Sequence, residues 1–228
     1  MITSGVEELG EVSLGYRTTG GLPGPPVVLL HGLGSAARTW DGFMAGFPRT
    51  CVALDLRGHG ASSHTDEYTF ESMASDVLAF LTARELSTVD LIGHSMGGGV
   101  AQLVAMRAPT LVRRMVIEDA PPPPVEALEP WPAPPALPPE PVDFDWAVVA
   151  PIFRQVRTQD PTWWARLPAV PVPTLWLAGG PTSHVDQARI TAAAAAMPSA
   201  RVAEIPAGHH IHRESPAEFA EVVGEFLG

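Results

Sequence analysis

The stretch LIGHSMGGGV at residues 91–100 places one serine, Ser95, between an apolar run and a series of glycines. The frame G-x-S-x-G, completed by Gly93 and Gly97, is typical of a sharp strand-to-helix turn that lifts a serine hydroxyl above a sheet. The helix that follows points its first N–H groups toward the serine, where they favour negative charge. Glycine-rich strand ends also bind phosphates. The rest of the chain therefore has to distinguish a nucleophilic serine from a phosphate-binding turn.

The pattern of apolar residues predicts an α/β fold. Six short apolar runs fit buried strands: 25–32, 50–60, 89–95, 113–121, 173–180 and 200–210. Their continuous rather than alternating apolarity suits strands covered on both faces, as in a parallel sheet. Helical stretches lie between them, at 69–85, 96–109 and 215–228, and the last opens with a capping box of Ser215 and Glu218. This alternation predicts a doubly wound, mostly parallel sheet, with a short antiparallel hairpin before residue 25 at its edge.

Composition limits the classes of function. The chain has 25 acidic and 14 basic residues and a net charge of −11, which argues against nucleic-acid binding. All the basic residues are arginine, so Schiff-base chemistry and a Ser–Lys dyad are excluded. Cys51 is the only cysteine and is expected to be a small core residue. The first residues have no signal-peptide pattern and no apolar stretch reaches ~18 residues, so we expect a cytoplasmic protein without a membrane span.

A segment rich in proline and tryptophan interrupts the α/β rhythm. Residues 121–141 contain eleven prolines, which exclude a sheet strand or a long helix there. We interpret 121–168 as a cap inserted over the carboxyl ends of the strands, between core segments 1–120 and 169–228. A solvated polyproline linker is the alternative, but a linker has no use for large apolar rings. Three tryptophans are expected to line the substrate pocket: Trp131, Trp146 and Trp163.

Two further features fit nucleophilic chemistry at Ser95. The turn HGLG after the first buried run offers the Leu33 N–H, which together with the Met96 N–H would form an oxyanion hole. A general-base histidine is expected near the C-terminus, where the cluster AGHHIHRESP follows the last strand. His209 comes directly after a glycine turn and is the preferred base, with His210 next. Metal binding by this histidine cluster is disfavoured because no carboxylate or cysteine lies at ligand spacing.

Four ordered motifs, HGLG, DLRGHGASS, GHSMGG and AGHHIHRESPAEF, together resemble the α/β-hydrolase fold family. The resemblance covers most of the chain except the cap. It implies an oxyanion loop at Leu33, a structural loop at 55–60, a nucleophile elbow at Ser95 and Met96, and a catalytic histidine at His209. It implies no metal and no organic cofactor.

The acid of the triad departs from the usual family pattern. The family usually places an aspartate after the next-to-last strand, but this chain has Ser183 there and Asp186 three residues later. Some members carry the acid after the strand that follows the elbow helix, where this chain has Glu118 and Asp119. Successive strand residues face opposite sides, so only one of these two can point to the site. Asp119 is preferred because it is nearer the carboxyl end of the strand, and Asp186 and Glu118 are the alternatives.

These features predict a serine hydrolase that cleaves a small or medium apolar carboxylic ester, thioester or lactone through a Ser95–His209–Asp119 triad. Carbon–carbon bond hydrolysis and cofactor-free lyase or perhydrolase chemistry on the same scaffold are alternatives, because the fold does not decide the reaction. A ligand receptor that keeps the triad without catalysis is a further alternative. Haloalkane dehalogenation is disfavoured, since that chemistry uses an aspartate where Ser95 stands.

Overall fold

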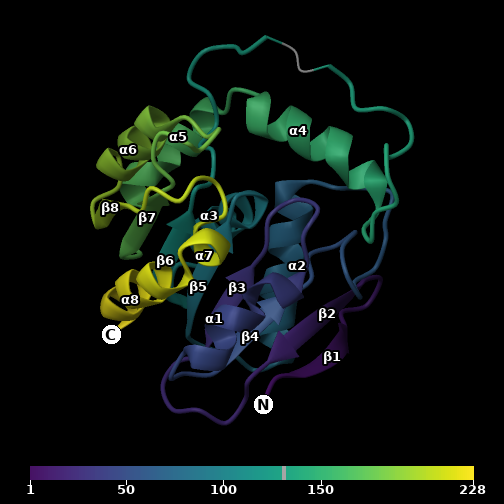
Figure 1. Ribbon diagram of the computed structural model, residues 1–228, viewed down its shortest axis with the longest axis vertical. Helices are drawn as coiled ribbons and strands as arrows, with labels where there is room; N and C mark the ends of the chain where they lie inside the picture. The colour runs from purple at the N-terminus through teal and green to yellow at the C-terminus, as the bar shows by residue number, and fades with distance from the viewer. Residues whose placement is uncertain (130–131) are drawn as a thin grey trace.

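The computed structural model describes residues 1–129 and 132–228, and its centre is an eight-stranded sheet (Figure 1). The strands are β1 (Thr3–Glu8), β2 (Ser13–Thr18), β3 (Val27–Leu30), β4 (Cys51–Leu54), β5 (Val89–His94), β6 (Val112–Glu118), β7 (Thr174–Ala178) and β8 (Ala200–Glu204). Their order is β1-β2-β4-β3-β5-β6-β7-β8. β1 and β2 form an antiparallel hairpin and β2 runs antiparallel to β4, whereas all other neighbours are parallel. The prediction of a mostly parallel α/β sheet with an edge hairpin is confirmed.

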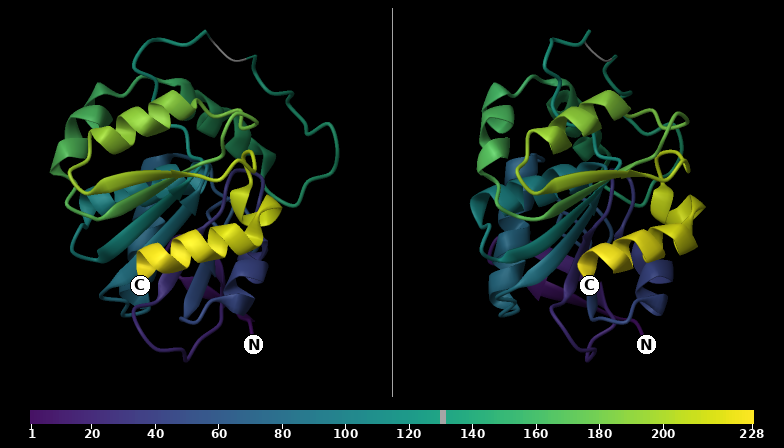
Figure 2. Two further views of the ribbon diagram at one scale, coloured as in Figure 1. Left: turned by 60° about the vertical axis from the view of Figure 1, so that its left-hand side comes forward. Right: turned by 90° about the vertical axis from the view of Figure 1, so that its left-hand side faces the viewer.

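Helices cover both faces of this sheet (Figure 2). The α-helices are α1 (Asp41–Gly46), α2 (Phe70–Ala83), α3 (Met96–Arg107), α4 (Val149–Arg157), α5 (Pro161–Arg166), α6 (Gln187–Ala195), α7 (Ile211–Glu214) and α8 (Pro216–Leu227). Short 3-10 turns lie at Ala37–Trp40, Trp146–Val148 and Leu167–Ala169. One apolar cluster joins the sheet to α2, α3 and α6, and a second joins its other face to α1 and α8. The sheet is therefore doubly wound.

The central strands and the last strand differ in burial. Every residue of β3, β4 and β5 is buried, as the continuous apolar runs predicted. The same expectation is wrong for β8, where Val202 keeps 39% of its surface exposed. β8 is an edge strand with β7 as its only neighbour in the sheet, so fewer elements cover it.

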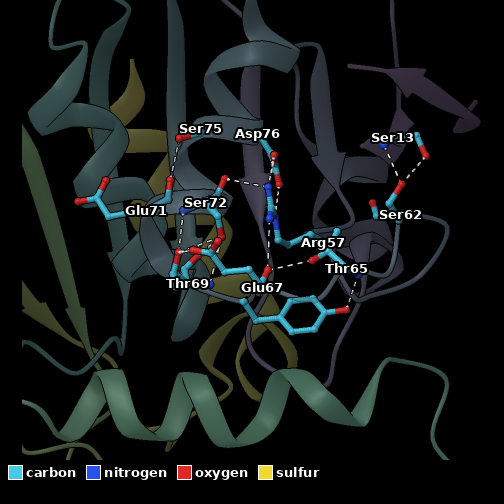
Figure 3. Close-up of polar contacts among 12 residues, drawn as sticks. Ser13, Arg57, Ser62, Thr65, Glu67, Thr69, Glu71, Ser72, Ser75 and Asp76 are labelled. Carbon is cyan, nitrogen blue, oxygen red and sulfur yellow. Dashed lines mark hydrogen bonds and ion pairs between the residues drawn. The ribbon is translucent and has the colours of Figure 1, made fainter. Parts of the chain in front are cut away.

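Two helix starts show what a capping box needs. At α2 the Ser72 N–H donates to Thr69 Oγ1 (3.0 Å) and the Thr69 N–H donates to Ser72 Oγ (3.1 Å), as Figure 3 shows. The capping box expected at Ser215 is wrong. Ser215 does precede α8, but its side chain accepts no hydrogen bond from the helix. Its own N–H, which Glu218 would have to bond, already donates to the carbonyl of Ile211, the first residue of α7 (2.9 Å).

The loop after β4 is bonded to α2. Arg57 forms a two-pronged ion pair with Asp76, with both N···O distances at 2.6 Å (Figure 3). Both side chains are largely buried, which excludes water from this pair. The pair joins this loop to α2, whose first residues, Phe70 and Glu71, line the pocket described below.

Residues 121–168 connect β6 to β7, and the helices α4 and α5 lie within this segment (Figure 1). α4 is attached to the start of α2 through Gln155, whose amide accepts from the Phe70 N–H (3.0 Å) and donates to the Tyr68 carbonyl (3.1 Å). A second attachment is the hydrogen bond from the Tyr68 hydroxyl to Asp145 (2.5 Å). No described helix combines the length and the apolar character that crossing a membrane requires.

Candidate active site

Ser95 occupies a strained turn between β5 and α3. Its φ of 52° lies in the left-handed region that non-glycine residues rarely adopt. A Cβ atom at Gly93 would lie 2.3 Å from the Gly97 carbonyl oxygen, and one at Gly97 would lie 2.4 Å from the Leu30 carbonyl oxygen. Only glycine fits at either position, which is the physical reason for the G-x-S-x-G frame.

The structure brings Ser95, His209 and Asp119 together from three distant parts of the chain. His209 Nε2 lies 3.1 Å from Ser95 Oγ, and His209 Nδ1 lies 2.8 Å from Asp119 Oδ2. A carboxylate only accepts, so Nδ1 carries the proton and Nε2 is free to accept the serine proton. This is the geometry of a nucleophile, a general base and a carboxylate that orients the base.

Asp119 is held by more than His209. Its Oδ1 accepts from the Gly179 N–H (3.0 Å) and from Gln187 Nε2 (3.1 Å), and its Oδ2 accepts from the Ser183 hydroxyl (2.5 Å). Burial by itself would raise the pKa of Asp119, but these donors together with His209 lower it below its ordinary value. The carboxylate therefore stays ionised beside the imidazole at neutral pH.

The other two candidate acids have different partners. Asp186 caps the start of α6, where it accepts from the Ala188 N–H (3.0 Å) and pairs with Arg189 (3.0 Å). Glu118 points to the opposite side of β6 from Asp119 and pairs with His212 (2.8 Å). Neither carboxylate is bonded to His209.

Ser183 belongs to the site, although the sequence suggested for it only that it stands where the family usually has an aspartate. It occupies the place after β7 where the family usually carries its acid, and here its hydroxyl donates to the carboxylate that comes from β6 instead. The signal was present in the sequence, because an aspartate after β6 and a serine after β7 converge at the same edge of the sheet.

The amides expected to form an oxyanion hole are positioned on both sides of Ser95. Met96 is the first residue of α3, and the loop of Leu33 passes so close that a Cβ at Gly32 would lie 3.2 Å from Ser95 Cβ. Among the described residues, neither the Leu33 N–H nor the Met96 N–H donates to a protein acceptor. Both donors are therefore available to a ligand.

Two buried histidines fix the loop that carries Leu33. His59 Nε2 accepts from the Gly34 N–H (3.1 Å), and His31 Nε2 accepts from the Leu56 N–H (3.0 Å). Burial lowers the pKa of both imidazoles, so they stay neutral and keep these acceptor roles.

The backbone of His209 is held by His94, which is buried next to the elbow. His94 Nε2 donates to the His209 carbonyl oxygen (2.9 Å), and burial lowers the pKa of His94 to about 4. The ring of His210 lies beside that of His209, with 5.0 Å between the ring centroids. Within residues 1–129 and 132–228, no group of three or more histidine, cysteine or acidic side chains is arranged to hold a metal ion.

A pocket of about 270 Å³ opens at Ser95. It is lined by Phe70, Glu71, Ser95, Gly99, Gln102, Leu103, Pro121, Pro123, residues 154–156, residues 158–160 and Trp163. Trp163 is thus on the pocket wall, as expected from the sequence. Trp146 is not on this wall, and its indole N–H donates to the Pro135 carbonyl (2.8 Å). The third expected pocket residue, Trp131, lies outside the described residues.

Comparison with known proteins defines the class. Residues 27–222 match the model of the alpha/beta hydrolase family, and the chain belongs to this family. The sn-1-specific diacylglycerol lipase ABHD11 of Xenopus tropicalis is 40% identical over 107 residues, which cover 45% of this chain and 34% of that protein. A probable alcohol acetyltransferase of Saccharomyces cerevisiae is 39% identical over 112 residues, which cover 44% of this chain and 32% of the relative. The match spans about a third of the length of these curated relatives.

Solved structures extend the likeness over the whole chain. A hydrolase from Pseudomonas aeruginosa PA01 superposes with a TM-score of 0.82 and 27% identity, covering 100% of this chain and 98% of that one. E-2-(acetamidomethylene)succinate hydrolase gives a TM-score of 0.84 at 20% identity, with 100% and 99% coverage. At this lower identity the likeness concerns the fold alone.

Proposed function

We propose that this protein is a serine hydrolase that cleaves carboxylic esters of small or medium apolar acyl groups. The observation that carries the proposal is the chain of contacts from Asp119 through His209 to Ser95, with a pocket open at the serine. The names of the relatives, a diacylglycerol lipase and an alcohol acetyltransferase, describe reactions that break or make esters, which supports an acyl substrate.

The proposed reaction has two halves. Ser95 Oγ attacks the ester carbonyl carbon while His209 Nε2 takes the serine proton, and the Leu33 and Met96 amides hold the resulting oxyanion. The carbon–oxygen bond of the ester breaks, and His209 gives its proton to the leaving alcohol. His209 then removes a proton from water, whose oxygen attacks the acyl carbon. The bond between that carbon and Ser95 Oγ breaks, and His209 returns the proton to Oγ as the acid leaves. Asp119 keeps the imidazole in the required tautomer and stabilises its cationic form.

We further propose that residues 121–168 form a cap over this site. The helices α4 and α5 supply Val156 and Trp163 to the pocket wall, and Leu103 faces the same space from α3. Apolar walls of this kind suit an acyl chain. We also propose that the protein is cytoplasmic and that its partner is a small molecule rather than nucleic acid or a membrane.

The test combines covalent labelling with turnover. A fluorophosphonate should modify the wild-type protein, and peptide mapping should place the label on Ser95. p-Nitrophenyl butyrate and octanoate should be hydrolysed, and Ser95→Ala should lose both the label and at least about 10⁴-fold in kcat. Thr39→Val is the control, because Thr39 is also bonded to a histidine but lines no part of the pocket. Hydrolysis that persists in Ser95→Ala, or cleavage only of ring-opened diketones, would contradict the proposal.

A further inference from the structure

The pocket at Ser95 also contains a cation. Arg154 of α4 lines it, together with the apolar side chains of Phe70, Leu103 and Trp163. Arg154 and Ser95 therefore line the same space, the first from α4 and the second from the turn before α3. A substrate that fills the pocket meets the serine, an apolar wall and a guanidinium group.

The acidic side chains on the pocket wall already have partners in the protein. Glu71 pairs with Arg107 (3.4 Å), and Asp160 caps α5 by accepting from the Trp163 N–H (2.8 Å). Neither carboxylate is paired with Arg154.

The amide groups on the wall are also engaged. Gln155 uses both ends of its amide on the backbone of Tyr68 and Phe70. Gln102 donates from Nε2 to the Gly98 carbonyl (3.0 Å), and Gln159 donates to the Val125 carbonyl. These groups hold the wall together and do not neutralise the cation.

Arg154 differs from the arginines that stabilise the fold. Arg49 and Arg113 both pair with the buried Asp90, and Arg57 pairs with Asp76. In the part of the chain that the structure describes, the Arg154 guanidinium has neither an ion pair nor a side-chain hydrogen bond. On the pocket wall, Arg154 is thus an exposed arginine without an ion pair to any described residue, in a chain whose net charge is −11. A carboxylate of an anionic ligand can form an ion pair with such a group.

We propose that Arg154 binds a carboxylate of the substrate, so that the preferred esters carry an anionic group beyond an apolar segment. This inference rests on the proposed ester hydrolysis at Ser95. A planar guanidinium fits a carboxylate with two parallel hydrogen bonds. The apolar side chains that line the same pocket fit the segment that joins the ester to the charge. The carboxylate belongs either to the acyl chain or to the leaving alcohol.

The expected effect is moderate because Arg154 is exposed to solvent. Water and salt weaken an ion pair at such a place, so we expect a preference of about tenfold in kcat/KM rather than an absolute requirement. The preference should shrink at about 1 M salt, where charges are screened within about 3 Å.

Two pairs of substrates test the inference and separate the two positions of the charge. The acyl pair is p-nitrophenyl octanoate and p-nitrophenyl hydrogen suberate, which differ only in the terminal carboxylate. The alcohol pair is phenyl octanoate and p-carboxyphenyl octanoate. kcat/KM is measured for each pair in the wild type, in Arg154→Gln and in the control Arg201→Gln, which removes the same charge from β8, away from the pocket.

Wild-type protein should favour the charged member of at least one pair about tenfold. Arg154→Gln should reduce the ratio of kcat/KM between the charged and the uncharged member to about one, and Arg201→Gln should keep both that ratio and the kcat/KM of the uncharged member. No preference in either pair, or a preference that survives Arg154→Gln, would overturn the inference. If octanoate hydrolysis survives Ser95→Ala, the proposed function fails instead, so the two failures are distinguishable.

Discussion

Two neighbouring carboxylates at the end of β6 form two similar chains of polar groups. Asp119 contacts His209 (2.8 Å), which contacts the Ser95 hydroxyl (3.1 Å). Glu118 contacts His212 (2.8 Å), which contacts the Thr39 hydroxyl (2.9 Å). Both are carboxylate–imidazole–hydroxyl chains with nearly the same distances.

Their surroundings are different. Ser95 borders a pocket, lies on a strained turn and has the Leu33 and Met96 amides beside it. His212 is only 6% exposed, and its ring stacks on the indole of Trp40 with 4.3 Å between the centroids. A carboxylate–imidazole–hydroxyl chain is therefore not by itself a sign of catalysis. An open pocket and two backbone amides that have no protein acceptor among the described residues distinguish the first chain, whereas the second holds α7 against the core.

The largest effect that separates the two chains concerns turnover. Asp119→Asn should lower kcat for p-nitrophenyl butyrate by about 10⁴-fold, because the neutral amide no longer fixes the His209 tautomer. Asp186→Asn is the matched control and should stay within a few-fold of wild type, since Asp186 caps α6. Steady-state kinetics on the purified variants checks this, and a large loss in Asp186→Asn with little in Asp119→Asn would reverse the assignment of the acid.

A smaller effect concerns the pH dependence of stability and His94, whose ring lies 4.7 Å from that of His209 and 5.2 Å from that of His212. Burial lowers the pKa of His94 from 6.5 to about 4, so the unfolded chain binds a proton on His94 in this range and the folded chain does not. The free energy of unfolding should therefore fall as the pH falls from 6.5 to 4, with about 3 kcal/mol of the loss due to His94.

Urea unfolding of the wild type and of His94→Asn across this range measures the contribution. The variant should show the shallower dependence, with the remaining slope due to other buried imidazoles such as His31 and His59. Equal slopes in the two proteins would show that His94 is not shielded from protons by burial.

The smallest effect concerns the buried pair itself. Glu118→Gln should lower the free energy of unfolding by about 2 kcal/mol, because Glu118 accepts from both the ring and the backbone N–H of His212 in a buried place. The kcat for esters should stay within a few-fold of wild type. Urea unfolding at neutral pH checks the stability, with the exposed Glu218→Gln on α8 as the control. A loss of turnover without a loss of stability would mean that the second chain takes part in catalysis.

The comparison of Glu118 with Asp119 shows how far sequence reasoning reached. Alternation along a strand predicted that only one of the two faces the site, and the structure places Asp119 there. The structure does not place Trp146 on the pocket wall as expected. Its place depends on how a proline-rich segment runs, and proline removes the periodic signals that guide prediction.

The capping box expected at Ser215 does not form because the Ser215 N–H donates to Ile211. Ile211 belongs to a helix of only four residues, which is too short to be recognised by its periodicity.

The alternation of strands and helices and the turn around Ser95 could be predicted from the amino-acid sequence, because they follow from apolar periodicity and local sterics. The order of serine, acid and histidine along the chain was implied by the resemblance to the hydrolase family. Tertiary structure alone decided that Ser183 would support Asp119, that His212 would be closed off by Trp40, and that Arg154 would share a pocket with Ser95. These contacts join residues far apart in the chain, and their distances depend on how the elements pack.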